Sequence, residues 1–375
     1  MPHAPIQQLS RRHRHIRDAM AARALDALVV TALPNVLYLS NFEGSSAIVV
    51  ITADRFLFVT DFRYVEAVSG TRGGPHECPG LELVVVDGSY DTTLASALAT
   101  LGAATVGFEA AHLSVARFDW LRATLARSEL VPTEAIVERV RVSKDTYELG
   151  VLREAARRLS SVAAKVPSLA RRGRTEREIA LAIDWQIRDA GFERSAFETI
   201  VASGPNAALP HARPSERRLD EGDVVVLDFG GVYDSYCVDL TRTVSVGPAS
   251  ARAREVHAAV LAAHDRAIAA VRPGRSRFDI DGAARASLEQ AGMAGAFGHG
   301  TGHGLGIEVH EDPRISRRRP GENADDDVVT SGMVFTIEPG AYFPEWGGVR
   351  IEDDVLVTET GVEVMTDVTT QLLEI

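Results

Sequence analysis

The chain has few cysteines and no long apolar run. Its 375 residues contain only Cys78 and Cys237, which are too few for a disulfide framework or a four-thiolate zinc site. The two could form one bridge, but a reduced, cytoplasmic chain is the simpler expectation. The nearest candidate for a membrane span, residues 24–39, contains Asp26 and Pro34 and is shorter than the ~18 residues that such a helix needs. The sequence therefore predicts no membrane partner.

Lysine is equally scarce. Lys144 and Lys165 are the only lysines, so arginine supplies 38 of the 40 basic residues. Acidic residues number 52, which gives a formal net charge of −12. Because proteins that bind duplex nucleic acid neutralise phosphates with lysine and arginine, this balance argues against a nucleic-acid partner. The apolar content of 45% is ordinary for a globular protein and too high for a disordered one.

Helix and strand patterns alternate through the first third of the chain, which predicts an α/β domain. Two runs of β-branched and aromatic residues, 46–52 and 56–60, are separated by three residues and predict a hairpin. The other expected strands are 27–31, 81–86 and 105–108, and the expected helices are 8–26, 91–101 and 114–127.

The segment 128–144 has mixed charge and no clear period, so we place a domain boundary there. The prediction is an N-terminal domain over residues 1–132, a linker over 133–145 and a C-terminal domain over 146–375. In the second domain, helices are expected over 145–166, 175–190, 251–271 and 277–291. The second of these begins with a capping box, because Glu178 follows Thr175 by three residues. Strand patterns dominate the rest, so this domain is expected to be α+β.

The C-terminal domain contains an internal repeat. Residues 222–230 align with 332–340, with glycine on glycine at both ends and Asp228 on Glu338. Each half continues into a second strand that carries another acid, Asp239 or Glu352. The alignment predicts a duplicated fold with a pseudo-two-fold axis.

Acidic residues at the ends of buried strands are the first chemical signal. Asp228 follows four apolar residues, and a carboxylate in such a place costs several kcal/mol unless it is paired or bound to a metal. A turn or helix-cap aspartate is the ordinary interpretation, but Asp239, Glu338 and Glu352 repeat the pattern. Around the last of these a strand is expected over 348–357, in which alternation places Arg350 and Glu352 on one face, and Val349 and Ile351 on the other.

A glycine-rich segment, residues 298–310, is the second signal. It contains His299, His303 and His310 and five glycines, which let the backbone approach a ligand or an ion closely. It matches no phosphate-binding loop and no HExxH motif. Four carboxylates and a histidine suit two divalent cations, most of all Mn²⁺, with Co²⁺ or Zn²⁺ as alternatives. Two such ions can hold a hydroxide and polarise a carbonyl.

Taken together, the motifs resemble the Xaa-Pro peptidase family, which includes aminopeptidase P and prolidase. The resemblance implies a creatinase-type α/β N-terminal domain and a pita-bread catalytic domain. The stretches that carry it are 209–215, 227–243, 298–311, 337–342 and 348–353, with 35–40 and 60–64 in the N-terminal domain. Two places depart from the family pattern. Ser40-Asn41-Phe42 stands where the family usually has Thr-Gly-Phe, after a tyrosine-containing strand that corresponds to residues 35–40 here. Ser235 replaces a glycine that is common in the turn between Asp228 and Asp239.

The resemblance also implies roles for individual residues. Asp228 would bind one metal, His303 and Glu338 the other, and Asp239 and Glu352 would bridge both. The remaining site residues, His211, His299, His310 and Arg350, would contact the substrate or the metal ligands. His310 would stabilise the tetrahedral intermediate, Arg350 would hold the bridging acids, and Glu338 would move the proton to the leaving nitrogen.

The expected activity is that of an Xaa-Pro aminopeptidase in which a metal-bridging hydroxide attacks the bond before proline. Proline has no N–H, which excludes proteases that recognise that donor. The alternative is an Xaa-Pro dipeptidase (prolidase); a metal-free C–N hydrolase like creatinase and a non-catalytic binding module are more remote. The segment 42–47 resembles bacterial aminopeptidase P, which favours the first interpretation. The family also implies a homodimer that binds proline-containing peptides.

Overall fold

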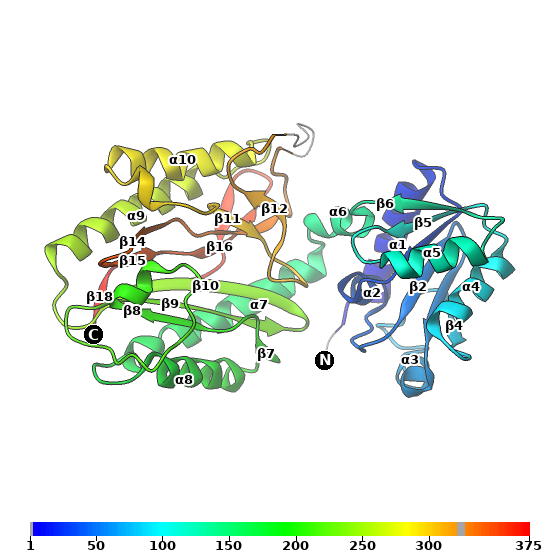
Figure 1. Cartoon of the computed structure of the whole chain (residues 1–375), viewed down its shortest axis with the longest axis horizontal. Coiled ribbons are helices and arrows are strands. Elements are labelled where there is room, and N and C mark those ends of the chain that lie inside the picture. The colour runs from blue at the N-terminus through cyan, green and yellow to red at the C-terminus, as the bar shows by residue number, and fades with distance from the viewer. Residues whose placement is uncertain (1–2, 321–326) are drawn as a thin grey trace. The chain divides into compact units, whose positions relative to one another are not determined.

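The computed structural model describes residues 3–320 and 327–375, which divide into two compact units, Met1–Arg141 and Val142–Ile375 (Figure 1). The division lies inside the segment 133–145, where the sequence predicts a linker. That segment contains a helix, α6 (Ile136–Val142), in place of irregular chain.

The first unit is built on a mixed six-stranded sheet of order β4-β3-β2-β1-β5-β6. The predicted hairpin is confirmed, because β2 and β3 pair antiparallel with Ile51 opposite Phe56. The strands are β1 (Ala27–Val30), β2 (Ile48–Thr52), β3 (Phe56–Thr60), β4 (Leu81–Val85), β5 (Thr105–Glu109) and β6 (Glu129–Thr133). The helices before α6 are α1 (Ile6–Ala21), α2 (Leu33–Ser40), α3 (Val65–Ser69), α4 (Tyr90–Leu101) and α5 (Val115–Thr124).

Helix α2 corrects one prediction. Residues 35–40 were expected to form the tyrosine strand, but they are helical, with a proline at the helix start and Asn41 in the left-handed region at its end. Short apolar runs have no period that separates a strand from a buried helix. Here Pro34 decides the outcome, because its fixed φ suits the first helical turn.

Over residues 142–320 and 327–375, the second unit has two pairs of α-helices and two main sheets. The helices are α7 (Thr146–Ala163), α8 (Glu176–Asp189), α9 (Ala251–Ala270) and α10 (Arg277–Gln290), close to the predicted ranges. The capping box of Thr175 and Glu178 is present at the start of α8. In Figure 1 the strands lie between the α7–α8 pair and the α9–α10 pair.

The strands of this unit form sheets of order β18-β10-β9-β7, with β8 also paired to β9, and β12-β11-β13-β16-β17; β14 and β15 form a separate ribbon. Their bounds are β7 (Arg194–Ser195), β8 (Ile200–Ser203), β9 (Val224–Tyr233), β10 (Tyr236–Ser245), β11 (Gly302–Gly304), β12 (Glu311–Ile315), β13 (Val334–Ile337), β14 (Gly340–Phe343), β15 (Gly347–Arg350), β16 (Asp353–Val357), β17 (Val362–Val364) and β18 (Leu373–Glu374).

The internal repeat is visible in the backbone. The aligned glycines Gly222 and Gly332 have φ angles of +88° and +89°, a region that L side chains rarely adopt. The Gly222 N–H donates to the carbonyl oxygen of Val246, directly after β10. The Gly332 N–H donates to the carbonyl oxygen of Val357, at the end of β16. Each half of the unit thus enters its acid-bearing strand through the same turn, as a duplicated fold requires.

Strand alternation aims the acids at one face. On β9 the side chains of Val225, Leu227 and Phe229 join the core formed with α7 and α8, so Asp228 faces the other way. On β10 the even-numbered residues Val238 and Leu240 join the same core, which turns Asp239 to the face of Asp228. The two aspartates are diagonal neighbours, because Asp228 pairs with Thr241 and Asp239 with Gly230.

Around Glu352 the predicted alternation is confirmed, while the predicted single strand is not. Val349 and Ile351 are buried in the core beneath α9 and α10, and Arg350 and Glu352 face away from it. The expected strand 348–357 is divided into β15 and β16, which pair with β14 and β13 respectively. Glu352 lies at the break between them.

The β9–β10 turn provides a test of stability. Asp234 and Ser235 have φ angles of +46° and +67°, as a two-residue hairpin turn requires. Replacing Ser235 with glycine is expected to stabilise the protein by roughly 0.5–1 kcal/mol, because relief of the unfavourable φ exceeds the added chain entropy. Urea unfolding of Ser235→Gly measures this. The matched variant Ser161→Gly, at an exposed position of helix α7, should lose stability; a loss in both variants would contradict the interpretation.

Two further features of the described residues concern the cysteines and the helices. Cys78 and Cys237 are free and buried, and burial raises the pKa of the Cys237 thiol to about 12, which suits a packed side chain. Across residues 3–320 and 327–375, no helix combines the length and apolar character that crossing a bilayer demands.

Candidate metal centre

One cavity in the second unit, of about 790 Å³, gathers every site residue named from the sequence. Its walls come from β9, β10, β11 and the ends of β13 and β15, which are far apart in the sequence. The predicted residues that line it are His211, Asp228, Asp239, His299, His303, His310, Glu338, Arg350 and Glu352. The cavity therefore brings the predicted metal ligands and the predicted substrate-contacting residues into one place.

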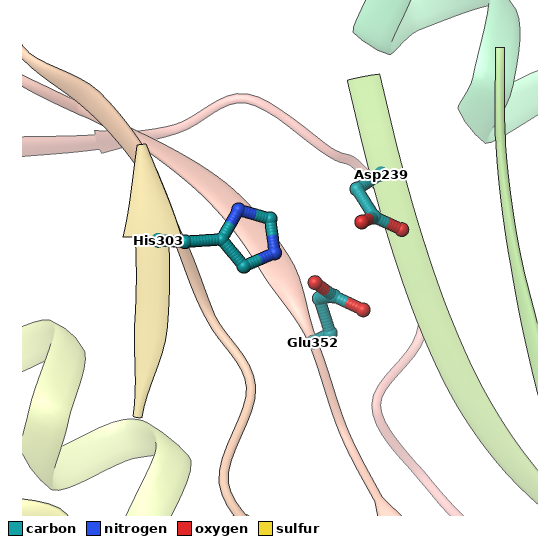
Figure 2. A group of neighbouring side chains, drawn as sticks. All are labelled: Asp239, His303 and Glu352. Atoms are coloured by element: carbon teal, nitrogen blue, oxygen red, sulfur yellow. The ribbon is translucent and has the colours of Figure 1, made fainter. Parts of the chain in front are cut away.

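Three of these side chains converge closely. One ligand atom each from Asp239, His303 and Glu352 lies within 4.8 Å of the other two, and all three residues are buried. Figure 2 shows the two carboxylates and the imidazole pointing toward one another, Asp239 from β10, His303 from β11 and Glu352 from the break between β15 and β16. Glu338 extends the group, because its Oε1 lies 3.6 Å from His303 Nε2.

The glycines beside His303 let its strand enter this crowded space. A Cβ at Gly302 would lie 1.8 Å from the backbone oxygen of Thr336, and a Cβ at Gly304 would lie 2.2 Å from that of Asp312. The ring itself is oriented by a contact of 3.1 Å between His303 Nδ1 and the Gly304 carbonyl oxygen. A carbonyl can only accept, so Nδ1 carries the hydrogen and the lone pair of Nε2 faces the carboxylates.

Burial and crowding disfavour charge on the acids in the metal-free protein. Burial, followed by the negative charges of Glu352 and Asp228, raises the pKa of Asp239 well above its usual value. Burial and the charge of Glu338 raise the pKa of Glu352 in the same way, and burial raises the pKa of Glu338 to about 7. Burial lowers the pKa of His303 to about 3, so its imidazole is neutral at physiological pH.

This donor set fits divalent metal ions. Within the described ranges, Arg350 is the only arginine or lysine that hydrogen bonds to one of the four carboxylates, so most of their negative charge is not compensated. The buried oxygens Asp228 Oδ1 and Asp239 Oδ1 have no hydrogen-bond partner among the described residues. Buried charges need a counter-charge, and carboxylates with one neutral imidazole are ligands that Mn²⁺, Co²⁺ and Zn²⁺ accept.

A hydrogen-bonded chain of side chains supports Asp228. Arg350 Nη2 donates to Asp228 Oδ2, and Arg350 Nη1 donates to the hydroxyl of Tyr342 at 2.9 Å. The same hydroxyl lies 2.9 Å from His299 Nε2, while His299 Nδ1 lies 2.7 Å from the Gly300 carbonyl oxygen. Burial lowers the pKa of His299 to about 4. The neutral ring therefore donates through Nδ1 and accepts from Tyr342 through Nε2. Both ring nitrogens of His299 are engaged within the protein.

The other two histidines lie at the rim. His211 and His310 are exposed, and the His310 ring centroid is 4.3 Å from that of His303. Partial burial, with a further contribution from Arg314, lowers the pKa of His310. These two imidazoles are thus more exposed than that of His299, which is partly buried.

Arg314 also lines the cavity and was not predicted from the sequence. It is exposed on β12 directly opposite His303 on β11, and among the described residues its guanidinium makes no ion pair. Its charge contributes to the lowered pKa of His303 and of His310. Only the strand pairing reveals this position, because nothing in residues 311–315 repeats or resembles a binding motif.

Comparison with known proteins gives the family. Residues 150–359 match the model of metallopeptidase family M24, and residues 12–143 match that of the creatinase/prolidase N-terminal domain. The Xaa-Pro dipeptidase of Pyrococcus furiosus is 32% identical over 356 residues, which cover 94% of this chain and 97% of that protein.

Solved structures agree in fold across both units. An Xaa-Pro dipeptidase from Bacillus anthracis superposes with a TM-score of 0.92 at 35% identity, covering 98% of this chain and 100% of that one. An X-Pro aminopeptidase from Thermotoga maritima gives 0.87 at 32% identity, covering 97% and 99%. The predicted fold, a creatinase-type N-terminal domain followed by a pita-bread domain, is confirmed. The chain belongs to the metallopeptidase family M24.

Proposed function

We propose that the protein is an Xaa-Pro dipeptidase that uses two divalent metal ions. The observation that carries the proposal is Arg314, a cation without an ion-pair partner in the described structure, in the same cavity as the carboxylate cluster. A dipeptide places its C-terminal carboxylate one residue beyond the scissile carbonyl, so a guanidinium near the metal ligands suits it. The names of relatives from Pyrococcus furiosus and Bacillus anthracis support the same choice.

The proposed metal ligands are those expected from the sequence: Asp228, Asp239, His303, Glu338 and Glu352. When bound there, divalent ions supply a Lewis acid for the scissile carbonyl and lower the pKa of water from about 16 to about 7. The convergence of Asp239, His303 and Glu352 supports this set, and so does the excess of buried negative charge.

We assign the remaining steps to the protein's own side chains. A Glu338 carboxylate oxygen receives the proton of the attacking water and delivers it to the proline nitrogen, which must be protonated to leave. His211 and His310 contact the peptide at the rim, with His310 stabilising the tetrahedral intermediate. Arg350 holds Asp228 in place. For His299 we infer a positioning role: because both of its ring nitrogens are engaged within the protein, it orients Tyr342.

Aminopeptidase action on longer peptides is the second candidate, and it was the first choice from the sequence. The similarity to the Thermotoga maritima X-Pro aminopeptidase favours it. A cavity of about 790 Å³ could also accommodate a peptide longer than two residues. The dipeptidase relatives and Arg314 outweigh these points, so dipeptide hydrolysis is the proposal.

A substrate panel separates the two candidates. Protein loaded with Mn²⁺ is incubated with Ala-Pro and with Ala-Pro-Ala, and alanine release is measured. We expect kcat/KM for Ala-Pro to exceed that for Ala-Pro-Ala at least ~10-fold, since a charge-assisted contact to the dipeptide carboxylate is worth about 1.5–3 kcal/mol. Turnover of the tripeptide alone would instead identify an aminopeptidase.

Three further expectations belong to this proposal. The native metal is Mn²⁺, which the acid-rich ligand set favours over Zn²⁺. The protein is a homodimer and is located in the cytoplasm; both follow from the family resemblance and from composition. A creatinase-like metal-free hydrolase and a non-catalytic module lose support, because the full set of candidate ligands lies in one cavity.

A further inference from the structure

A buried carboxylate outside the cavity binds both ends of the segment that carries His211. Glu176 is the first residue of α8, and it is 0% exposed. Its Oε1 accepts hydrogen bonds from the backbone N–H and the hydroxyl of Ser203, both at 2.7 Å. Its Oε2 accepts from the same two groups of Ser215, at 3.0 and 2.6 Å. The Asn206 amide donates to both oxygens at 3.0 and 3.1 Å.

The segment 203–215 connects this carboxylate to the cavity. It contains a 3-10 turn, Gly204–Ala208, and then reaches the cavity wall at Pro210 and His211. Strand β15 holds its middle, because Arg350 donates to the Pro210 carbonyl oxygen at 3.3 Å. A Cβ at Gly348 would lie 2.3 Å from the Ala207 backbone oxygen, so β15 and the 3-10 turn are in close contact.

We propose that Glu176 is a positioning residue for His211. It is absent from the cavity wall, so any effect on the substrate must pass through the segment that it holds. Six hydrogen bonds from five donor atoms of three residues converge on the carboxylate, which fixes the two ends of the segment relative to α8. The proposal rests on the proposed function in one respect, namely that His211 contacts the peptide.

The substitution Glu176→Gln tests the anchor with little change in volume. The glutamine amide nitrogen can only donate, so it would face either the Ser203 or the Ser215 N–H and leave that donor without an acceptor. Glu178→Gln is the matched control: Glu178 is exposed on the same helix turn and bonds to the Thr175 N–H, not to segment 203–215.

Hydrogen–deuterium exchange of the Mn²⁺-loaded protein gives a readout that does not depend on activity. We expect peptides covering 204–215 to exchange about tenfold faster in Glu176→Gln, with β9 and β10 unchanged and with no such change in Glu178→Gln. Unchanged exchange over 204–215 would overturn the proposal. Wild-type protein that hydrolyses no proline dipeptide would refute the proposed function, and the exchange result would still decide whether Glu176 is the anchor.

Kinetics distinguish positioning from a general loss of stability. Glu176→Gln is expected to raise KM for Ala-Pro about tenfold with a smaller change in kcat. In a His211→Ala background the same substitution should leave KM unchanged. It should still lower Tm, as in the wild-type background, because the lost hydrogen bond destabilises the fold in both. If the double variant instead raised KM by the product of the two single-variant factors, the two residues would act independently, which would contradict the proposal. If Glu176→Gln does not fold, Ser215→Ala removes one of the six hydrogen bonds to Glu176, together with those that the Ser215 hydroxyl accepts from Asn206 and from the Arg217 N–H. It should give a weaker form of the same pattern.

Discussion

Replacing Asp239 with asparagine is expected to lower kcat/KM for Ala-Pro by more than ~10³-fold and to abolish metal binding. Asp239 lies at the centre of the cluster with His303 and Glu352, and loss of even an outer partner of a metal ligand costs about 10–100-fold. Steady-state kinetics and elemental analysis of the purified variant measure both effects. Asp265→Asn, the same chemical change at an exposed position on α9, should leave activity and metal content unchanged.

The same substitution should stabilise the metal-free protein. Burial and the charges of Glu352 and Asp228 disfavour the Asp239 carboxylate, and an amide of equal size removes that repulsion. We expect the metal-free Tm to rise by a few °C. Because the pKa values of Asp239 and Glu352 are raised in the fold, wild-type stability without metal should fall as pH rises above the usual carboxyl range, and less so in Asp239→Asn. Full metal retention in the variant would contradict the assignment.

Replacing Arg314 with alanine is expected to raise KM for Ala-Pro about 10–100-fold with little change in kcat. Because its guanidinium makes no ion pair with any described residue, it is proposed to bind the substrate carboxylate, and a hydrogen bond to a charged group contributes about 1.5–3 kcal/mol. Alanyl-proline amide lacks that carboxylate, so its kcat/KM should be nearly the same in wild type and variant. The measurement is a comparison of the two substrates in the two proteins.

Arg317→Ala controls for the loss of positive charge on the same segment, since Arg317 is exposed and lies outside the cavity wall. It should behave like wild type on both substrates. If Arg314→Ala lowered kcat/KM equally for the dipeptide and for its amide, Arg314 would support the site without binding the substrate carboxylate. No loss on either substrate would remove the main support for the dipeptidase proposal.

The acids of the site could be predicted from the sequence because burial makes them conspicuous. A carboxylate at the end of a buried apolar strand needs a counter-charge or a metal ion to offset its burial. Four such carboxylates at matched places in a repeat are best explained by one shared site. The repeat itself is reproduced in the backbone, down to the φ angles of Gly222 and Gly332. Strand alternation likewise predicts, from the sequence alone, that Arg350 and Glu352 lie on the same face.

What could not be predicted depends on pairing between distant segments. Arg314 enters the cavity because β12 pairs with β11, and the register that sets it opposite His303 has no local signature. The hydrogen bond of His299 Nε2 likewise depends on a distant residue, because its partner Tyr342 lies on a strand 43 residues later. Helix α2 was missed for a different reason, namely that a short apolar run is ambiguous between helix and strand.

The most direct test of the metal centre is a titration of chelated protein with Mn²⁺ while proline release from Ala-Pro is followed. We expect no activity in the chelated protein. Activity should return with added metal and saturate near two ions per chain. It should not return in Asp239→Asn. Undiminished hydrolysis of Ala-Pro by the exhaustively chelated protein would show that catalysis does not depend on a metal ion.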